Sequence, residues 1–279
     1  MTTWEPQTYL RYADIRFRAG LDLMARIPKG EYSSIYDLGC GTGHLTHILA
    51  DTFSNSKVVG IDSSPEMLAE ARREFPALTW QQADIRSWHP ATPPDLIYTN
   101  AALQWVPDHE TLLPALLNML RPGGVFAMQV PRHFESPSHL GLKDLVMQTE
   151  WRAKLEPLLL APIPPPETYW RWLSPHARHV DLWESIYLQV LDGKDPVVNF
   201  MRGTALRPFL SALPEHEAAK FIDSFAERMA AAYPAEPSGQ TLFPFRRLFL
   251  VVQASRVEIF HSASTSAKAH PSAHIPDLT

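Results

Sequence analysis

Two hydrophobic patterns alternate along the first half of the chain. Short apolar runs, typical of buried strands, are separated by longer stretches whose apolar residues recur at helical spacing. The expected strands are 34–38, 57–61, 78–81, 95–99 and 125–130, and the expected helices between them are 45–52, 64–75 and 110–120. This alternation predicts βαβ units, a mostly parallel sheet and helices on both of its faces.

The pattern changes after the fifth expected strand. Residues 132–178 and 196–233 have helical spacing interrupted by prolines, whereas 180–190 and 247–254 have the apolar character of strands. We expect the two late strands to pair antiparallel at one edge of a doubly wound α/β sheet. The helical segments would then form a cap over the C-terminal edge of the sheet, as insertions at about 132–178 and 193–240.

The two ends of the chain differ from its body. Residues 6–27 carry apolar side chains at helical spacing, whereas 256–279 are rich in Ser, Ala and His and are predicted to be disordered. Residues 1–255 are therefore expected to form a single domain. The sequence has no apolar run of about 18 residues and no signal-like N-terminus, so we expect a cytoplasmic protein.

Composition narrows the function classes. The chain of 279 residues is 45% hydrophobic and 20% charged, as is ordinary for a globular protein. Its formal net charge of −5 lacks the excess of positive charge that is typical of nucleic-acid-binding proteins. Cys40 is the only cysteine, which excludes an internal disulfide and a cysteine-rich zinc site. His44 and His47 have the spacing of a metal pair, but no third ligand is evident, so no metal site is predicted.

The segment YDLGCGTG, residues 36–43, follows the first expected strand. Gly39, Gly41 and Gly43 allow positive φ angles and a close approach of the backbone, at the turn where ligands of doubly wound sheets bind. A tight turn without a ligand is the alternative. The dinucleotide-binding fingerprint G-x-G-x-x-G requires a glycine at its sixth position. Counted from Gly39, that position is occupied by His44, so the chain lacks the NAD-binding pattern.

Acidic residues follow three neighbouring strands of the predicted sheet. Asp37 lies at the end of the first strand, Asp62 at the end of the second, and Asp84 after the third. Asp62 can accept hydrogen bonds from both ribose hydroxyls of an adenosine group, or else cap the next helix. Asp84 can accept from an adenine amino group while Ile85 packs on the ring, or it is simply an acid of the loop.

Together these segments resemble the class I S-adenosylmethionine-dependent methyltransferases. The motifs DLGCGTG, GIDSSPEML, ADIRSW and LRPGG carry the resemblance, over about residues 34–131. It implies a Rossmann-like seven-stranded sheet with a reversed late strand, and S-adenosylmethionine as cofactor. The cofactor-binding residues that it implies are Asp37, Gly39, Gly41, Gly43, Asp62, Ser63, Met67, Asp84, Ile85 and Asn100.

A second resemblance, to the trans-aconitate 2-methyltransferase family, runs from Trp4 to Val252. Its motifs include DIRSWHP, TALRPFL and FPFRRLFLVV, and it implies methylation of one carboxylate of a small polycarboxylic acid, trans-aconitate, to a monomethyl ester. Another small or carrier-bound carboxylate is the alternative substrate. The chain departs from this family at VPRHF, where Arg132 and His133 replace an Asp-Asn pair and add positive character.

The expected chemistry needs no general base. A carboxylic acid with a pKa of about 4 is ionised at pH 7 and can attack a sulfonium methyl group directly, once both are held in line. Arginines are expected to grip the non-reacting carboxylates, with weaker neutral donors orienting the reacting one. The candidate substrate-orienting residues are Gln104, Trp105, Arg207, Arg16, Arg132 and His133, and further arginines near the expected site are Arg18, Arg246 and Arg247.

Other function classes have weaker support. Nucleic-acid methylation disagrees with the acidic balance and with the absence of an N/D-P-P-Y motif, because Asn100 is followed by Ala-Ala-Leu. A protein that binds S-adenosylmethionine only as a sensor, and an NAD-dependent oxidoreductase, are the remaining alternatives. We expect no nucleic-acid or membrane partner, and a monomer or a homodimer.

Overall fold

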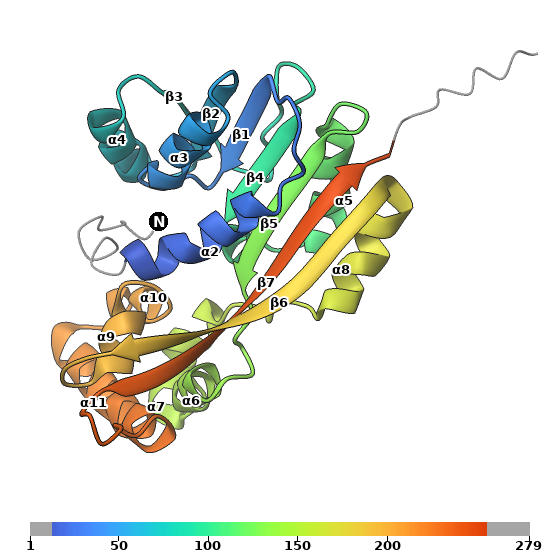
Figure 1. Cartoon of the computed structure of the whole chain (residues 1–279). Helices are drawn as coiled ribbons and strands as arrows, with labels where there is room; N and C mark the ends of the chain where they lie inside the picture. The colour runs from blue at the N-terminus through green and yellow to red at the C-terminus, as the bar shows by residue number, and fades with distance from the viewer. Residues whose placement is uncertain (1–12, 256–279) are drawn as a thin grey trace, which may run out of the picture.

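The computed structural model describes residues 13–255, with side chains described from Phe17 onward. A seven-stranded sheet runs through the molecule (Figure 1). Its strands are β1 (Ser34–Leu38), β2 (Lys57–Asp62), β3 (Thr79–Gln82), β4 (Leu96–Asn100), β5 (Val125–Pro131), β6 (Ala177–Leu191) and β7 (Thr241–Ala254). Their order is β3-β2-β1-β4-β5-β7-β6, and β7 is antiparallel to both β5 and β6 in an otherwise parallel sheet. The predicted doubly wound fold with a reversed late strand is confirmed.

Helices cover both faces of the sheet, which explains why β4 and β5 are almost continuously buried and apolar. One face packs against α2 (Ala13–Ala25) and α3 (His44–Thr52). The other packs against α5 (His109–Met119) and α8 (Pro166–Leu173). α4 (Pro65–Glu74) contacts β2 and β3. None of the helices in residues 13–255 combines the length and the apolar character needed to cross a bilayer.

The strand order reverses between β1 and β4. Chain order runs outward from β1 to β2 and β3 on one side, and from β4 to β5 on the other. The parallel register places Asp37 beside Gly60 on β2 and beside Tyr98 on β4. The carboxyl ends of β1, β2 and β4 therefore meet at the switch point, where doubly wound sheets bind ligands.

A separate helical layer, here called the cap, lies beyond the carboxyl ends of the parallel strands (Figure 1). Its helices are α6 (Pro137–Val146), α7 (Thr149–Leu155), α9 (Pro196–Arg202), α10 (Arg207–Ser211) and α11 (Glu215–Ala232). They share an apolar core that contains Phe221 and Phe225. The predicted insertion 132–178 also contained α8, but this helix packs on α5 and β6 rather than in the cap.

The antiparallel pair of β6 and β7, whose connection contains α9, α10 and α11, joins the sheet to the cap. β7 begins at Thr241, before the predicted start at Arg247, and its first residues pair only with β6. Pro244 is tolerated there because no strand within residues 13–255 bonds that side of β7. This pair of strands extends beyond the rest of the sheet (Figure 1), and Phe243 and Phe245 of β7 join the apolar core of the cap.

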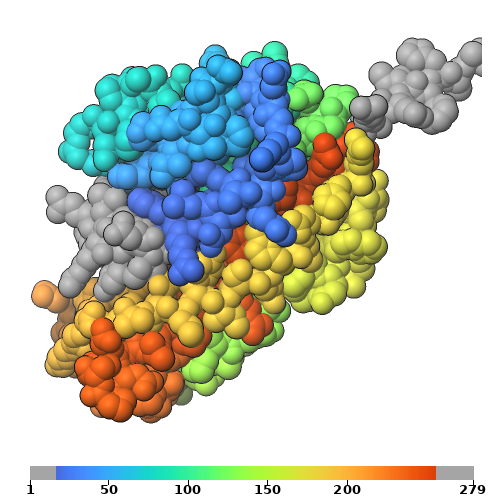
Figure 2. Space-filling model, in the orientation of Figure 1, coloured from blue at the N-terminus to red at the C-terminus, as the bar shows by residue number. Residues whose placement is uncertain are grey.

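Helix α2 lies between the first half of the sheet and the antiparallel β6–β7 pair (Figure 2). Tyr98 Oη donates to the Gly20 carbonyl at 2.9 Å, which ties α2 to the sheet. Arg26 pairs with Asp181 on β6 at 3.0 Å. The predicted helix 6–27 begins within residues 1–12, which lie outside the described residues, as does the predicted disordered tail 256–279.

Candidate active site

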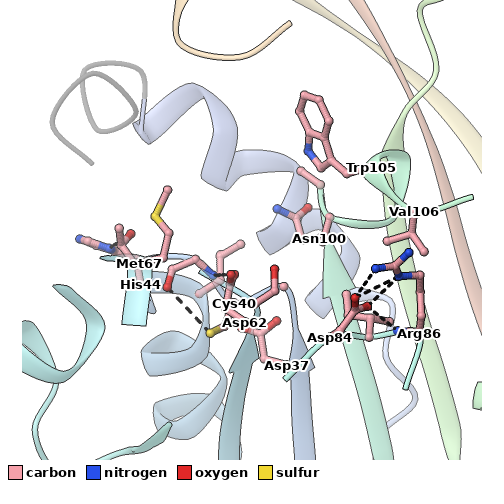
Figure 3. A pocket seen from close by; sticks show the side chains of 18 of the residues that line it. Asp37, Cys40, His44, Asp62, Met67, Asp84, Arg86, Asn100, Trp105 and Val106 are labelled. Atoms are coloured by element: carbon pink, nitrogen blue, oxygen red, sulfur yellow. Dashed lines mark hydrogen bonds and ion pairs between the residues drawn. The ribbon is translucent and has the colours of Figure 1, made fainter. Parts of the chain in front are cut away.

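A cavity of about 350 Å³ lies at the carboxyl ends of β1, β2 and β4 (Figure 3). Its acidic side chains lie along the strand ends, and Asn100 and Trp105 lie above them in the view of Figure 3. Nine of the ten predicted cofactor-binding residues line it: Asp37, Gly39, Gly41, Asp62, Ser63, Met67, Asp84, Ile85 and Asn100. The tenth, Gly43, is not part of the lining.

The glycine turn brings two loops into contact. Gly39 has φ +74°, and a Cβ at this position would overlap the Cβ of Ala102, in the turn after β4. The amides of Gly39 and Cys40 both donate to the Ile61 carbonyl, at 2.7 and 3.0 Å. Gly41 has φ +57°, and a Cβ added there would meet no atom of the described residues within 4 Å, so they leave the cavity open above it. Backbone can therefore approach a ligand here without side-chain obstruction.

Gly43 has a structural role instead. It precedes α3 with φ +83°, and a Cβ there would overlap the ring of Trp80. The sequence prediction placed it against the cofactor because it shares the glycine motif. Its side-chain-free position is instead required by the packing of β3 against the start of α3.

Gly43→Ala is therefore expected to destabilise the fold by about 2–4 kcal/mol, through backbone strain together with overpacking against Trp80. Gly239→Ala is a matched control, since Gly239 has the same φ of +83° and a Cβ there would meet no atom of the described residues within 4 Å. Thermal unfolding of both variants separates the two causes. Equal losses of stability would show that the contact with Trp80 contributes nothing.

Asp62 joins the turns after β1 and β2. Its Oδ2 accepts from the Gly41 amide and its Oδ1 from the Ser64 amide, both at 2.8 Å. The cap of α4 is a different residue, Ser64, whose Oγ accepts from the Met67 amide at 3.2 Å. Asp62 faces the cavity, and each carboxylate oxygen has remaining capacity to accept from a ribose hydroxyl.

Asp37 is nearly fully buried at the base of the same cavity. Burial raises its pKa to about 7; the hydrogen bond from Thr46 Oγ1, at 2.6 Å, opposes this shift, and the Asp62 charge adds to it. A cation in the cavity would favour the ionised carboxylate. Asp37 is thus suited to an ammonium group.

The Asp37→Asn variant is expected to melt at a higher temperature than the parent at about pH 8, with the difference shrinking as pH falls and vanishing only below the ordinary pKa of 3.8. The folded parent binds the Asp37 proton more tightly than the unfolded chain does, so its stability falls as pH rises from the ordinary pKa of 3.8 to about 7. Asn keeps an acceptor for Thr46 without this cost. Melting curves across this pH range test it, with the exposed Asp51→Asn as control, and a pH-independent difference would contradict the assignment.

Asp84 is held by a neighbouring cation. The Arg86 guanidinium and amide donate to its carboxylate, which lowers the pKa of Asp84. Both residues line the cavity and lie together at its rim (Figure 3). An adenine amino group would therefore share the Asp84 carboxylate with Arg86.

A second cavity of about 400 Å³ lies between the strand ends and the cap. It shares Ala101 and Trp105 with the first cavity. The cap contributes an apolar wall that includes Phe200 and Phe209. The polar and charged side chains of the lining are Gln104, His133, Glu135, His139, Lys143, Thr204 and Arg247.

The turn after β4 separates the two cavities. Ala101 has φ +53°, an uncommon conformation for a residue with a side chain, and its amide donates to the Gln129 carbonyl at 2.9 Å. Gln104 Nε2 donates back to the Ala101 carbonyl at 2.6 Å. His109 contacts the Leu103 carbonyl through Nε2 at 2.8 Å. These bonds fix the short helix that carries Trp105.

The predicted substrate-orienting residues divide into three groups. Gln104, Trp105 and His133 line the second cavity. Arg132 and Arg207 line neither cavity: Arg132 donates to Glu184 on β6 at 3.0 Å, and Arg207 is half-buried at the start of α10. The side chain of Arg16 lies outside the described part of the chain.

Arg247 is the arginine that the second cavity presents. It is 3% exposed, its Nη1 donates to Gln129 Oε1 at 3.0 Å, and its guanidinium lies 4.7 Å from the centre of the Phe245 ring. The alternation along β7 gave a signal for it. Phe243, Phe245 and Arg247 share one face of the strand, whereas Arg246 points to the other, exposed face.

Several residues that line the two cavities were not among the predicted site residues. Phe17 and His44 line the first cavity with their rings stacked, 5.3 Å between centroids, and His44 pairs with Glu74 at 3.1 Å. His139 and Lys143, from α6, line the second. No signal within the local sequence distinguished these from ordinary helix residues. Within residues 13–255, no group of three or more His, Cys, Asp or Glu side chains could hold a metal ion.

Comparisons with known proteins identify relatives along nearly the whole chain. Residues 35–124 match a family model described as "Methyltransferase domain". Among solved structures, the YcgJ protein of Bacillus subtilis has a TM-score of 0.54 at 16% identity, covering 85% of this chain and 97% of that one. Coclaurine N-methyltransferase has a TM-score of 0.50 at 18% identity, covering 84% and 72%. These structures share the fold.

Closer relatives extend the match beyond the fold. The trans-aconitate 2-methyltransferase of Azoarcus sp. strain BH72 is 46% identical over 252 residues, covering 90% of this chain and 99% of that protein. The enzyme of the same name from Methylobacterium nodulans is 40% identical over 258 residues, covering 92% and 100%. The glycine turn, the acids and the cap therefore lie within one long alignment, and the chain belongs to the trans-aconitate 2-methyltransferase family.

Proposed function

We propose that this protein transfers a methyl group from S-adenosylmethionine to a carboxylate of trans-aconitate, giving a monomethyl ester. One observation carries the proposal: the cofactor cavity adjoins, at the shared lining residues Ala101 and Trp105, a second cavity with a buried arginine. The family relatives, named for this reaction, support the substrate.

The first cavity fits the proposed cofactor. Asn100 Oδ1 is buried, lines this cavity and has no hydrogen-bond partner among the described residues, so it can accept from an ammonium group. Asp37 provides a carboxylate for the same cation, and Asp62 accepts from the ribose hydroxyls. Ile85 offers an apolar surface to the adenine ring. When bound, S-adenosylmethionine supplies an electrophilic methyl group on its sulfonium sulfur.

The second cavity positions the nucleophile. Arg247 can hold a non-reacting carboxylate with paired, charge-assisted hydrogen bonds. Gln104, whose amide nitrogen is engaged by Ala101, keeps its side chain at the junction of the cavities, and Trp105 excludes water there. The reacting carboxylate is already ionised, so holding it in line supplies the catalysis and no side chain needs to remove a proton.

Turnover with a panel of acids tests the proposal. The full chain is incubated with S-adenosylmethionine carrying a CD₃ group and with trans-aconitate, cis-aconitate, citrate or a dicarboxylic acid. Mass spectrometry is expected to find the labelled monomethyl ester of trans-aconitate as the main product. A labelled ester of another acid as the main product would show that this acid, and not trans-aconitate, is the substrate. Consumption of the cofactor without formation of any ester would refute carboxylate methylation.

We also propose that the protein acts on a free small acid and has no nucleic-acid partner. A small polycarboxylate that fits a cavity of about 400 Å³ needs no nucleic-acid or carrier-protein groove. The net charge of −5 agrees with a small anionic substrate that is bound by a few buried cations rather than by a basic surface. A cytoplasmic location, and a monomeric or homodimeric state, stay predictions.

A further inference from the structure

Two imidazoles meet on the wall of the second cavity. The rings of His133, which follows β5, and His139, on α6, have centroids 4.0 Å apart and planes inclined at 68°. Both line the cavity beside Arg247. His133 Nδ1 is buried and has no hydrogen-bond partner among the described residues, whereas His139 Nδ1 lies 3.2 Å from Ser138 Oγ. The pair therefore has unused hydrogen-bonding capacity in the substrate cavity.

The charge of the cavity does not match that of a tricarboxylate. Its lining contains two permanent cations, Arg247 and Lys143, and one carboxylate, Glu135. A fully ionised tricarboxylate carries three negative charges. His133 and His139 are the only other titratable groups on the described lining, so further positive charge from this lining can come only from them.

Both rings are neutral at pH 7 without an anion. Burial lowers the pKa of His139 to about 4. Burial also lowers the pKa of His133, aided by His139 and the Arg247 charge, while the Arg246 backbone opposes this shift. A carboxylate beside the rings would favour the protonated form, because opposite charges stabilise each other. Two imidazoliums at this separation would repel, so the pair favours a single shared proton.

We infer that His133 and His139 together form a second carboxylate-binding site in the substrate cavity, which takes up one proton when a tricarboxylate binds. Arg247 then holds one carboxylate and the imidazole pair another, leaving the third at the junction near Gln104 and Trp105. The inference rests on the proposed function and adds His139 as a specificity-determining residue. It also implies that substrate affinity falls as pH rises through the range in which the free pair is neutral and the bound pair is protonated, a range that includes pH 7.

Calorimetry tests proton uptake directly. Trans-aconitate is titrated at about pH 7 into the full chain saturated with S-adenosylhomocysteine, in HEPES and in Tris, whose ionisation enthalpies differ. The dependence of the binding enthalpy on the buffer is expected to correspond to about one proton taken up per acid bound. Binding with no proton uptake would overturn the inference.

Variants assign the proton to the pair. The double variant His133→Asn/His139→Gln is expected to lose the uptake, to raise KM for trans-aconitate about tenfold at pH 7, and to flatten its rise with pH. KM for S-adenosylmethionine and the melting temperature serve as checks of folding. His47→Gln, on the exposed side of α3, is the matched control and is expected to behave as the parent. Undiminished uptake in the double variant would refute the assignment.

Product analysis of the same samples separates this inference from the proposed function. If the parent forms the trans-aconitate ester but binds without proton uptake, only the role of the histidine pair is lost. If the parent neither binds nor methylates trans-aconitate, the proposed function fails and the inference fails with it.

Discussion

S-adenosylhomocysteine is expected to bind the Asp62→Asn variant about 5- to 150-fold more weakly than the parent, a loss of about 1–3 kcal/mol. The carboxylate is buried at the strand ends and faces the cavity, where hydroxyl donors of a ribose would find both oxygens. Asn keeps one oxygen and replaces the other by an NH₂ group, which is a donor. This group would face another donor: either one of the two backbone amides that now donate to Asp62, or one hydroxyl of the ligand. Calorimetry measures the loss.

A local distortion of the turn must be separated from the loss of a ligand contact. Ser64→Ala removes the hydrogen bond to the Met67 amide, so it is expected to cost about 1 kcal/mol of stability while leaving cofactor affinity within about twofold. If Ser64→Ala weakens binding as much as Asp62→Asn does, Asp62 acts only by shaping the turn.

Arg247→Lys is expected to raise KM for trans-aconitate about 30- to 150-fold and to leave the affinity for S-adenosylhomocysteine unchanged. Lysine keeps the positive charge but loses the planar fork that can bind a carboxylate through two hydrogen bonds, which is worth about 2–3 kcal/mol. Burial makes the substitution sensitive, because water cannot replace the lost donors at a side chain that is 3% exposed. Steady-state kinetics with trans-aconitate as the varied substrate measure the effect.

The next residue along β7 gives the matched control. Arg246 points away from the cavity, with 43% of its side chain exposed, near Glu184. Arg246→Lys is expected to change neither KM. Equal effects of the two substitutions, or an Arg247→Lys protein that loses cofactor affinity as well, would show that Arg247 supports the fold of β7 rather than binding substrate.

The sheet and the cofactor cavity could be predicted because their determinants are local. Most strands of the first half are short apolar runs, β3 being the exception, and the residues that immediately follow β1, β2 and β4 supply most of the cavity wall. The same reasoning failed at Gly43, since spacing alone does not show that the ring of Trp80, from a different strand, occupies the space of a side chain.

The substrate cavity depended on long-range packing. Arg207 was a predicted substrate-orienting residue, but only the contact of the cap with the antiparallel β6–β7 pair shows that Arg247 is the residue that reaches the cavity. Arg132 was expected beside the substrate, yet it faces Glu184 while the next residue, His133, turns inward. The predicted strand began at Arg247 and missed the start of β7. Pro244 lies in the missed part, where one side of the strand is unpaired among the described residues, and this is a property of the sheet rather than of the local sequence.

A crystal structure of the full chain with S-adenosylhomocysteine and trans-aconitate would test the central claim most directly. We predict the adenosyl group over Asp62 and Ile85, the thioether sulfur at the turn of Ala101 and Trp105, and one carboxylate oxygen of the acid in line with it across that turn. Another carboxylate is expected on Arg247. Electron density for the acid outside the second cavity, or for the nucleoside away from the carboxyl ends of β1 and β2, would contradict it.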